Sequence, residues 1–395
     1  MRQGSGVRLF KLAGALMLGG VVSSIGLIGL TGCGEFFTPV GTGTVGNGTS
    51  TYVYVTNSGG TLAEFSLTSG VLAALSGSPV ALTETPTSIV VAPNNAFVYV
   101  GSSSGAFVYT INSDGTLTEG NSNNIAYVNA NGYVPASMVI DPTSSWLIIA
   151  YQSETELDAV PISPTTGLPT GTVFSVTTSF ADPTPHLAIS PANAQVFVAL
   201  GTGGTEAFGF TPTGTTAPKG PWGTAVSIGL IATDGGTADS AVTVDPTSKY
   251  LFIAEQNSNT SGAIAGTLRL ISTAALGTDL DDEPVGVGPS AVLSDLTGAY
   301  AYVTNGTDGT ISGFSLSTTT QKLTSLGAAS PTEASPVGIV EDSSKTYVMD
   351  VGNGANPNLW LYSFDSTSAG VLDVGSTKST ASTNPSLANA IAVTH

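Results

Sequence analysis

The chain has 395 residues and a formal net charge of −18 at pH 7, with 27 acidic side chains against nine basic ones. This acidity argues against a nucleic-acid partner, because a polyanion would be repelled and the sequence has no basic stripe to bind it. Only 9% of the residues are charged, whereas 49 are glycine, a composition that favours many short strands joined by tight turns over helices.

The N-terminus has the order of a secretion signal. Arg2, Arg8 and Lys11 precede an apolar run over residues 12–30, which we interpret as a signal peptide covering residues 1–32. The alternative is a signal-anchor helix that remains uncleaved.

Cys33 ends the tetrad LTGC, which resembles the bacterial lipobox, where the cysteine is lipidated and becomes the first residue of the mature protein. It is the only cysteine, so it cannot form a disulfide within the chain. Residues 33–50 are rich in glycine and threonine and are interpreted as a flexible tether. We therefore expect a lipoprotein of the bacterial cell envelope, anchored to a membrane through Cys33 and facing the periplasm or the exterior.

A repeat occupies residues 51–395. A short apolar strand runs into a turn and then into a second strand that usually begins with an aromatic residue. The turn-opening residues recur 47 to 55 residues apart and are Ala92, Asp141, Ser190, Asp245, Asp295 and Asp342. Five residues after each of them comes Phe97, Trp146, Gln195, Tyr250, Tyr300 or Tyr347. This period indicates blades or solenoid turns.

The two ends of the repeat complete one another. The segment led by Tyr52 is a second strand that lacks its own first strand, and residues 391–393 at the C-terminus have the pattern of a first strand. A ring needs such a split pair, because the last strand then closes the first blade and removes an open edge. We predict an all-β chain: a seven-bladed β-propeller of four-stranded blades, closed by the C-terminal strand.

The tetrad YVTN occurs twice, at Tyr54 and at Tyr302. It resembles the YVTN-type propeller repeat, which is related to lactonase-like seven-bladed propellers, and the resemblance covers the chain from Tyr52 to the C-terminus. It implies the fold, and it suggests hydrolysis of a sugar lactone such as 6-phosphogluconolactone.

Polar residues are expected at one opening of the central channel, where first strands begin and second strands end. The candidates for ligand binding at this mouth are Asn57, Tyr151, Asp239, Asn305 and Asn389. We single out His186 and Glu255 as candidate catalytic residues, because a histidine beside a carboxylate can take a proton from water that attacks a lactone carbonyl. In the alternative interpretation, His186 is a hydrogen-bonded structural histidine near the axis.

Basic residues are predicted to lie away from this mouth. A phosphorylated substrate calls for Arg or Lys donors, and Arg269, for example, falls within a third strand. No cofactor motif is present, and no metal site is expected. Residues 279–283 (DLDDE) are interpreted as a solvated acidic loop, with calcium binding left open. Trp222 lies in the longest repeat and is interpreted either as a lid over its own blade or as an exposed contact.

Three functions remain from these observations. We favour a binding or scaffolding module of the cell envelope, with an envelope protein or a carbohydrate as its ligand, because no catalytic set is demonstrable. The alternative is a lactone hydrolase with its site at the channel mouth. A surface-layer or adhesion protein is the third possibility, since low charge and richness in Thr, Gly and Ser suit it equally.

Overall fold

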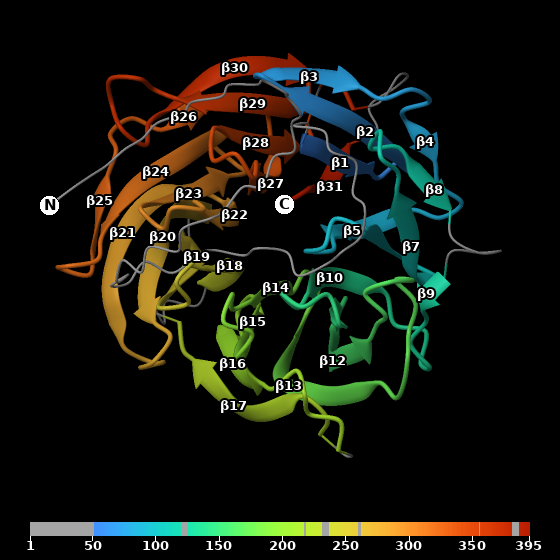
Figure 1. Cartoon of the computed structure of the whole chain (residues 1–395). Helices are drawn as coiled ribbons and strands as arrows, with labels where there is room; N and C mark the ends of the chain where they lie inside the picture. The colour runs from blue at the N-terminus through green and yellow to red at the C-terminus, as the bar shows by residue number, and fades with distance from the viewer. Residues whose placement is uncertain are drawn as a thin grey trace, which may run out of the picture. The chain divides into compact units, whose positions relative to one another are not determined.

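The computed structural model describes residues 51–119, 125–216, 219–230, 237–259, 262–354, 356–380 and 387–395. The predicted signal peptide, Cys33 and the tether lie outside these residues. The described chain folds into seven antiparallel sheets and contains no helix. The sheets follow one another around a ring, as the colours in Figure 1 show. The predicted all-β, seven-bladed propeller is therefore confirmed.

The blades are numbered in chain order. Blade 1 contains β1 (Thr51–Asn57), β2 (Thr61–Thr68), β3 (Val71–Ala74), β4 (Val80–Ala81) and, as its innermost strand, β31 (Ala388–Val393). Blade 2 contains β5 (Pro86–Val91), β6 (Phe97–Ser102), β7 (Gly105–Ile111), β8 (Leu117–Glu119) and β9 (Ile125–Tyr127). Blade 3 contains β10 (Pro135–Ile140), β11 (Trp146–Tyr151), β12 (Glu154–Pro161) and β13 (Phe174–Asp182). Blade 4 contains β14 (His186–Ile189), β15 (Gln195–Ala199), β16 (Thr205–Phe210) and β17 (Trp222–Ile228).

The remaining blades follow the same order from the axis outward. Blade 5 contains β18 (Ala238–Val244), β19 (Tyr250–Asn259), β20 (Gly262–Ser272) and β21 (Asp279–Val287). Blade 6 contains β22 (Pro289–Ser294), β23 (Tyr300–Asn305), β24 (Thr310–Ser317), β25 (Lys322–Ser325) and β26 (Ser330–Pro331). Blade 7 contains β27 (Pro336–Glu341), β28 (Tyr347–Gly352), β29 (Leu359–Phe364) and β30 (Leu372–Lys378).

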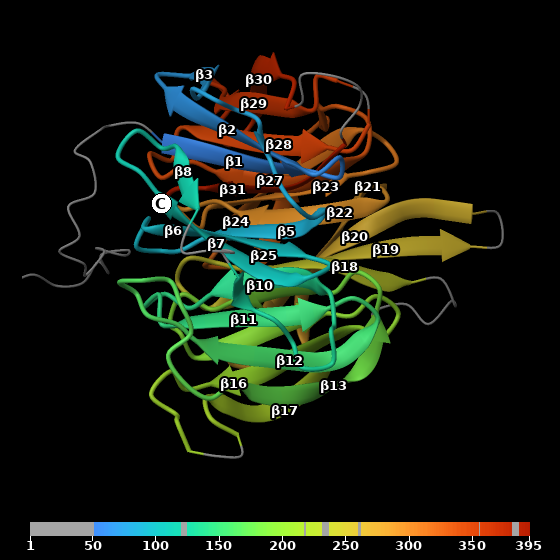
Figure 2. The ribbon, with the colours of Figure 1, turned by 90° about the vertical axis from the view of Figure 1, so that its right-hand side faces the viewer.

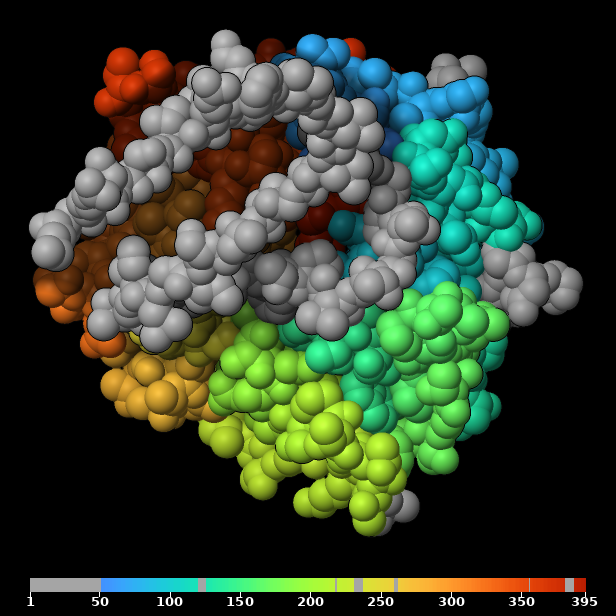
Figure 3. Space-filling view, in the orientation of Figure 1, coloured from blue at the N-terminus to red at the C-terminus, as the bar shows by residue number. Residues whose placement is uncertain are grey.

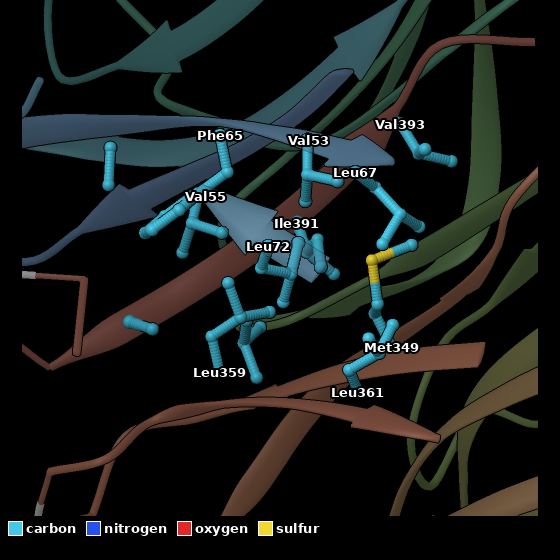
Figure 4. Close-up of a cluster of buried hydrophobic side chains, with 13 residues drawn as sticks. Val53, Val55, Phe65, Leu67, Leu72, Met349, Leu359, Leu361, Ile391 and Val393 are labelled. Carbon is cyan, nitrogen blue, oxygen red and sulfur yellow. The ribbon is translucent and has the colours of Figure 1, made fainter. Parts of the chain in front are cut away.

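The C-terminal strand closes the ring. β31 pairs antiparallel with β1, with Val55 opposite Ile391 and Val53 opposite Val393. Side chains of both strands enter a buried cluster with Met349 and other residues of blade 7, which Figure 4 shows from within. Burying each such aliphatic side chain stabilises the fold by about 1.5–3 kcal/mol, so the closure is held by packing as well as by backbone pairing.

The turn-opening aspartates fix the turn between the first two strands of a blade. In blade 3, Asp141 Oδ1 accepts hydrogen bonds from the backbone N–H groups of Ser145 and Trp146, each at 2.6 Å. Asp245 accepts from the equivalent pair of N–H groups in blade 5, also at 2.6 Å. The aspartates therefore recur because they satisfy donors that the tight turn leaves unpaired.

The aromatic residues that lead the second strands join each blade to the next one. A Cβ added to Gly115 of blade 2 would lie 2.1 Å from the ring of Tyr52 of blade 1, and one added to Gly370 of blade 7 would lie 2.3 Å from the ring of Tyr300 of blade 6. Gln195, the non-aromatic member, donates from Nε2 to the carbonyl of Thr273 in blade 5 at 3.3 Å. This position recurs from blade to blade because its side chain packs neighbouring blades together.

The ring has two different faces. Register places the beginning of each first strand opposite the end of the second strand, as in Pro289 opposite Asn305, and we call this end of the blades the mouth face. The aspartate turns lie at the other end, the turn face. In the side view of Figure 2, the β19–β20 hairpin projects beyond the other blades. Figure 3 shows the blades packed in chain order around one face of the ring.

Candidate functional site

Most of the polar residues predicted to line the mouth are buried within the blades. Asn57 is fully buried, and its Oδ1 accepts a hydrogen bond from the hydroxyl of Thr380 at 2.6 Å. Tyr151 is buried and donates to Asp158 Oδ2 at 2.6 Å. Asn305 is fully buried and donates to two hydroxyl groups of β24. Asn57 is thus bonded to the connection that follows blade 7, whereas Tyr151 and Asn305 are bonded within their own blades.

Asn389 is half-buried and connects blades. It donates from Nδ2 to the carbonyl of Pro86 at 2.6 Å, and Thr87 donates in the same way to the carbonyl of Pro135 at 2.5 Å. Ser290 repeats the contact with the carbonyl of Pro336 at 2.6 Å. The polar residues at the start of these inner strands therefore serve first as links around the ring.

Asp239 and Glu255 lie side by side in blade 5. They are directly opposite one another on β18 and β19. Arg269 on β20 reaches both of them: its Nη1 lies 3.2 Å from Glu255 Oε2 and 3.7 Å from Asp239 Oδ1. Its Nη2 lies 3.1 Å from Asp279 Oδ1 on β21. We call Asp239, Glu255, Arg269 and Asp279 the Arg269 cluster.

The Arg269 cluster contains three carboxyl groups and one cation. Asp239, Glu255 and Arg269 are each at most 3% exposed. Burial is the main reason that the pKa of Asp239 is raised to about 7. The neighbouring Glu255 also raises this pKa, whereas hydrogen bonding to Thr205 and the charge of Arg269 lower it. Asp239 therefore holds its proton more tightly than an exposed aspartate does, because a buried carboxyl group beside another one resists ionisation.

The placement of Arg269 corrects the prediction that it lies apart from the mouth residues. Arg269 is on a third strand, as expected, but its long side chain reaches back along the blade to Glu255. Residues 279–283 are also not a loop, because they begin β21. Asp279 faces Arg269, and Asp281 Oδ1 pairs with Lys322 Nζ at 2.7 Å.

His186 faces the same interface between blades 4 and 5. On adjacent strands of blade 4, His186 lies opposite Ala199, and Ala199 lies opposite Thr205, so the three side chains form one row on one face of the sheet. Ala199 packs with core residues of blade 5, and Thr205 Oγ1 donates to Asp239 Oδ2 at 2.6 Å. The row therefore points toward the Arg269 cluster, with His186 about 10 Å from Thr205 at two strand spacings.

The imidazole of His186 is the polar group nearest to the axis in this row. It is half-buried, and its Nδ1 has no hydrogen-bond partner among the described residues. Burial lowers the pKa of His186, so the neutral form, with one nitrogen able to accept a proton, dominates at pH 7.

A second carboxyl pair lies between blades 6 and 7, and it was not anticipated. Asp350 and Glu333 are both buried, and the hydroxyl of Thr332 contacts both of them. Burial raises the pKa of Asp350 well above its usual value, and Glu333 raises it further. The signal was present in the sequence, because Asp350 interrupts the apolar strand that begins at Tyr347.

Trp222 is neither an exposed contact nor a lid over its own blade alone. It is 3% exposed, and its Nε1 donates to the carbonyl of Phe174 in blade 3 at 2.8 Å. Its ring packs edge-on against Phe208 and Phe210 of blade 4. It therefore joins blades 3 and 4 near the outer rim.

Two properties can be stated for the part of the chain that the structure describes. It contains no helix with the length and apolar character needed to span a bilayer. It also brings together no three His, Cys, Asp or Glu side chains in an arrangement able to hold a metal ion.

The comparisons agree with this architecture. The family model described as "Lactonase, 7-bladed beta-propeller" matches residues 47–217. A Bacteroides uniformis protein named provisionally as a 6-phosphogluconolactonase aligns with a TM-score of 0.65 and 16% identity, covering 87% of this chain and 99% of its own. The periplasmic gluconolactonase of Pseudomonas aeruginosa aligns with a TM-score of 0.65 and 14% identity, covering 88% of this chain and 99% of its own. No curated protein sequence matches the chain.

The fold is a seven-bladed β-propeller, and its residues 47–217 are similar to the lactonase propellers. The resemblance predicted from the YVTN tetrads is therefore confirmed. The structural neighbours are too distant in sequence to carry more than the fold.

Proposed function

We propose that the protein is a lactone hydrolase whose site lies at the mouth end of the interface between blades 4 and 5. The observation that carries the proposal is the row from His186 to Thr205, which faces the carboxyl pair of Asp239 and Glu255. The similarity to the lactonase propeller family supports this reading over the scaffolding role expected from the sequence.

His186 acts as the general base. Neutral imidazole takes a proton from a water molecule as that water attacks the lactone carbonyl. When the ring C–O bond breaks, the imidazolium returns the proton to the ring oxygen, which gives the hydroxy acid. The Arg269 cluster holds three carboxyl groups and one cation, and its excess negative charge stabilises the imidazolium that forms. Asp239 and Glu255 are buried and act on His186 through their charge, across the interface between blades 4 and 5.

Hydrolysis of a sugar lactone by the full-length chain in mild detergent tests the proposal, with acid release followed in a pH-stat. His186→Ala should lower kcat/KM at least 100-fold, which corresponds to about 2.7 kcal/mol of barrier. The matched control is His395→Ala, which removes the only other histidine and should leave activity unchanged. Turnover that survives His186→Ala in a folded protein would exclude this site.

A second measurement separates positioning from mere stability. Glu255→Gln keeps the size of the side chain but removes its charge, so the pKa of His186 in the pH–rate profile should fall while KM changes little. A profile that does not shift would remove the Asp239–Glu255 pair from the mechanism.

Location outside the cytoplasm and membrane anchoring are part of the proposal. The likeness to a periplasmic gluconolactonase supports an extracytoplasmic site of action, and the LTGC tetrad supports lipidation of Cys33. Metabolic labelling with a fatty-acid probe should mark the wild-type chain and leave Cys33→Ser unlabelled. Labelling that persists in Cys33→Ser would refute the anchor.

A further inference from the structure

The position of each cation in the propeller bears on the chemistry of the substrate. Residues 51–395 contain six Lys and Arg side chains, and all six lie in the described part of the chain: Lys219, Lys249, Arg269, Lys322, Lys345 and Lys378. Arg269 is the one that reaches the proposed site. It is 3% exposed and is paired with three carboxyl groups, which balance its positive charge and occupy its guanidinium.

The other five cations lie away from the interface between blades 4 and 5. Lys249 and Lys345 lie in the turns between first and second strands, on the turn face. Lys219 lies in the connection from β16 to β17, which starts at the same face. Lys322 is held by Asp281 on the outer strands. Lys378 ends the outermost strand of blade 7 opposite Leu359, which places it at the mouth face but two blades away from blade 5.

Acidic side chains outnumber Lys378 at the mouth face. They belong to the starts of inner strands, the ends of second strands and the turns beside them: Glu84, Glu154, Asp182, Asp239, Glu255, Asp308 and Glu333. A ligand that approaches this face meets a negative potential, which is screened only over about 8 Å at physiological salt.

We propose that the substrate is an uncharged sugar lactone, without a phosphate or carboxylate substituent. This assignment rests on the proposed hydrolase function. A phosphate monoester carries a charge of about −1.5 to −2 at pH 7 and normally requires Arg or Lys donors. Here it would meet carboxylates and a guanidinium that is already neutralised, whereas the hydroxyl groups of a neutral sugar lactone carry no such penalty.

Kinetics on a matched substrate pair test the assignment. The full-length chain is assayed with D-glucono-1,5-lactone and with its 6-phosphate, at about 20 mM and about 300 mM salt. The plain lactone should have a kcat/KM at least 100-fold higher at low salt. The phosphorylated lactone should gain with salt because screening relieves repulsion, and the plain lactone should not.

The outcomes separate the two proposals. Equal or faster turnover of the 6-phosphate overturns the substrate assignment and leaves the hydrolase function standing. Turnover of neither lactone refutes the hydrolase function and the assignment together.

A pair of charge variants locates the effect. Thr202 and Thr213 are both exposed on blade 4, Thr202 in the turn between β15 and β16 on the mouth face and Thr213 in the connection on the turn face. Thr202→Lys should raise kcat/KM for the 6-phosphate at least tenfold without changing that for the plain lactone. Thr213→Lys adds the same charge and should change neither; an equal gain from both variants would overturn the proposal.

Discussion

Tyr302 of blade 6 donates its phenolic hydrogen to the backbone carbonyl of Gly370 in blade 7, 2.6 Å away. Tyr54 makes the same bond to Gly115 in the next blade at 2.7 Å, and Tyr99 to Gly167 at 2.6 Å. Each of these tyrosines is buried, so each bond satisfies two polar groups that water does not reach. The tyrosine of the YVTN tetrad is thus a clamp between blades.

Removing one clamp should weaken the fold measurably. Tyr302→Phe leaves the carbonyl of Gly370 buried without its donor, and we expect a loss of about 1–2 kcal/mol in the free energy of unfolding. Urea denaturation followed by tryptophan fluorescence measures it. Tyr300→Phe is the matched control, because the hydroxyl of Tyr300 makes no hydrogen bond to the described residues, and it should change stability little.

The glycine beneath an aromatic ring should tolerate no side chain. Gly115 has a φ of +84°, and a Cβ there would lie 2.1 Å from the ring of Tyr52. Gly115→Ala should lower the free energy of unfolding by more than about 2 kcal/mol, because backbone strain adds to a clash. Gly77→Ala isolates the strain alone, since Gly77 has a similar φ of +88° and open space around it. Equal losses at the two positions would disprove the contact between blades.

Arg269 should matter far more to stability than an exposed cation. Arg269→Met leaves three carboxyl groups facing one another in a buried site, and we expect a loss of about 3–5 kcal/mol. Lys322→Met breaks the exposed ion pair with Asp281 and should cost less than about 1 kcal/mol. The double variant Arg269→Met with Asp239→Asn should recover part of the loss, measured by thermal unfolding near neutral pH.

Glu64 should make stability fall as the pH rises. It is 1% exposed, and burial is the main reason that its pKa is raised to about 7. A hydrogen bond from the N–H of Leu117 lowers this pKa, and the charge of Asp114 raises it. Between pH 4.5 and 7 the folded chain holds a proton that the unfolded chain has released, so the protonated form stabilises the fold at low pH and this stability is lost by about pH 7.

The variant Glu64→Gln removes this titration. It should therefore be more stable than the wild type at pH 8, by about 1–3 kcal/mol, and close to it at pH 4.5. The exposed Glu119→Gln is the control and should show no such difference. A Glu64→Gln variant whose stability runs parallel to the wild type across this range would contradict the assignment.

The sequence alone determined the architecture. Seven strand pairs, one of them split between the two ends of the chain, indicate a closed ring. Each repeat packs in the same way, so the same kinds of residue recur at the same position of each repeat. The recurring aspartates and leading aromatic residues could therefore be recognised in the sequence. Their recurrence alone does not show that each aromatic ring packs against the next blade.

Only the tertiary structure decided where the charged groups meet. Strand spacing placed Arg269 on a third strand but could not show that its side chain reaches Asp239 and Glu255, because a long flexible side chain spans two strands in either direction. The same holds for His186, because only the packing of blade 5 on blade 4 shows that the row from His186 to Thr205 meets Asp239. Periodicity fixes which residues share a face, whereas contacts between faces depend on how the blades are packed.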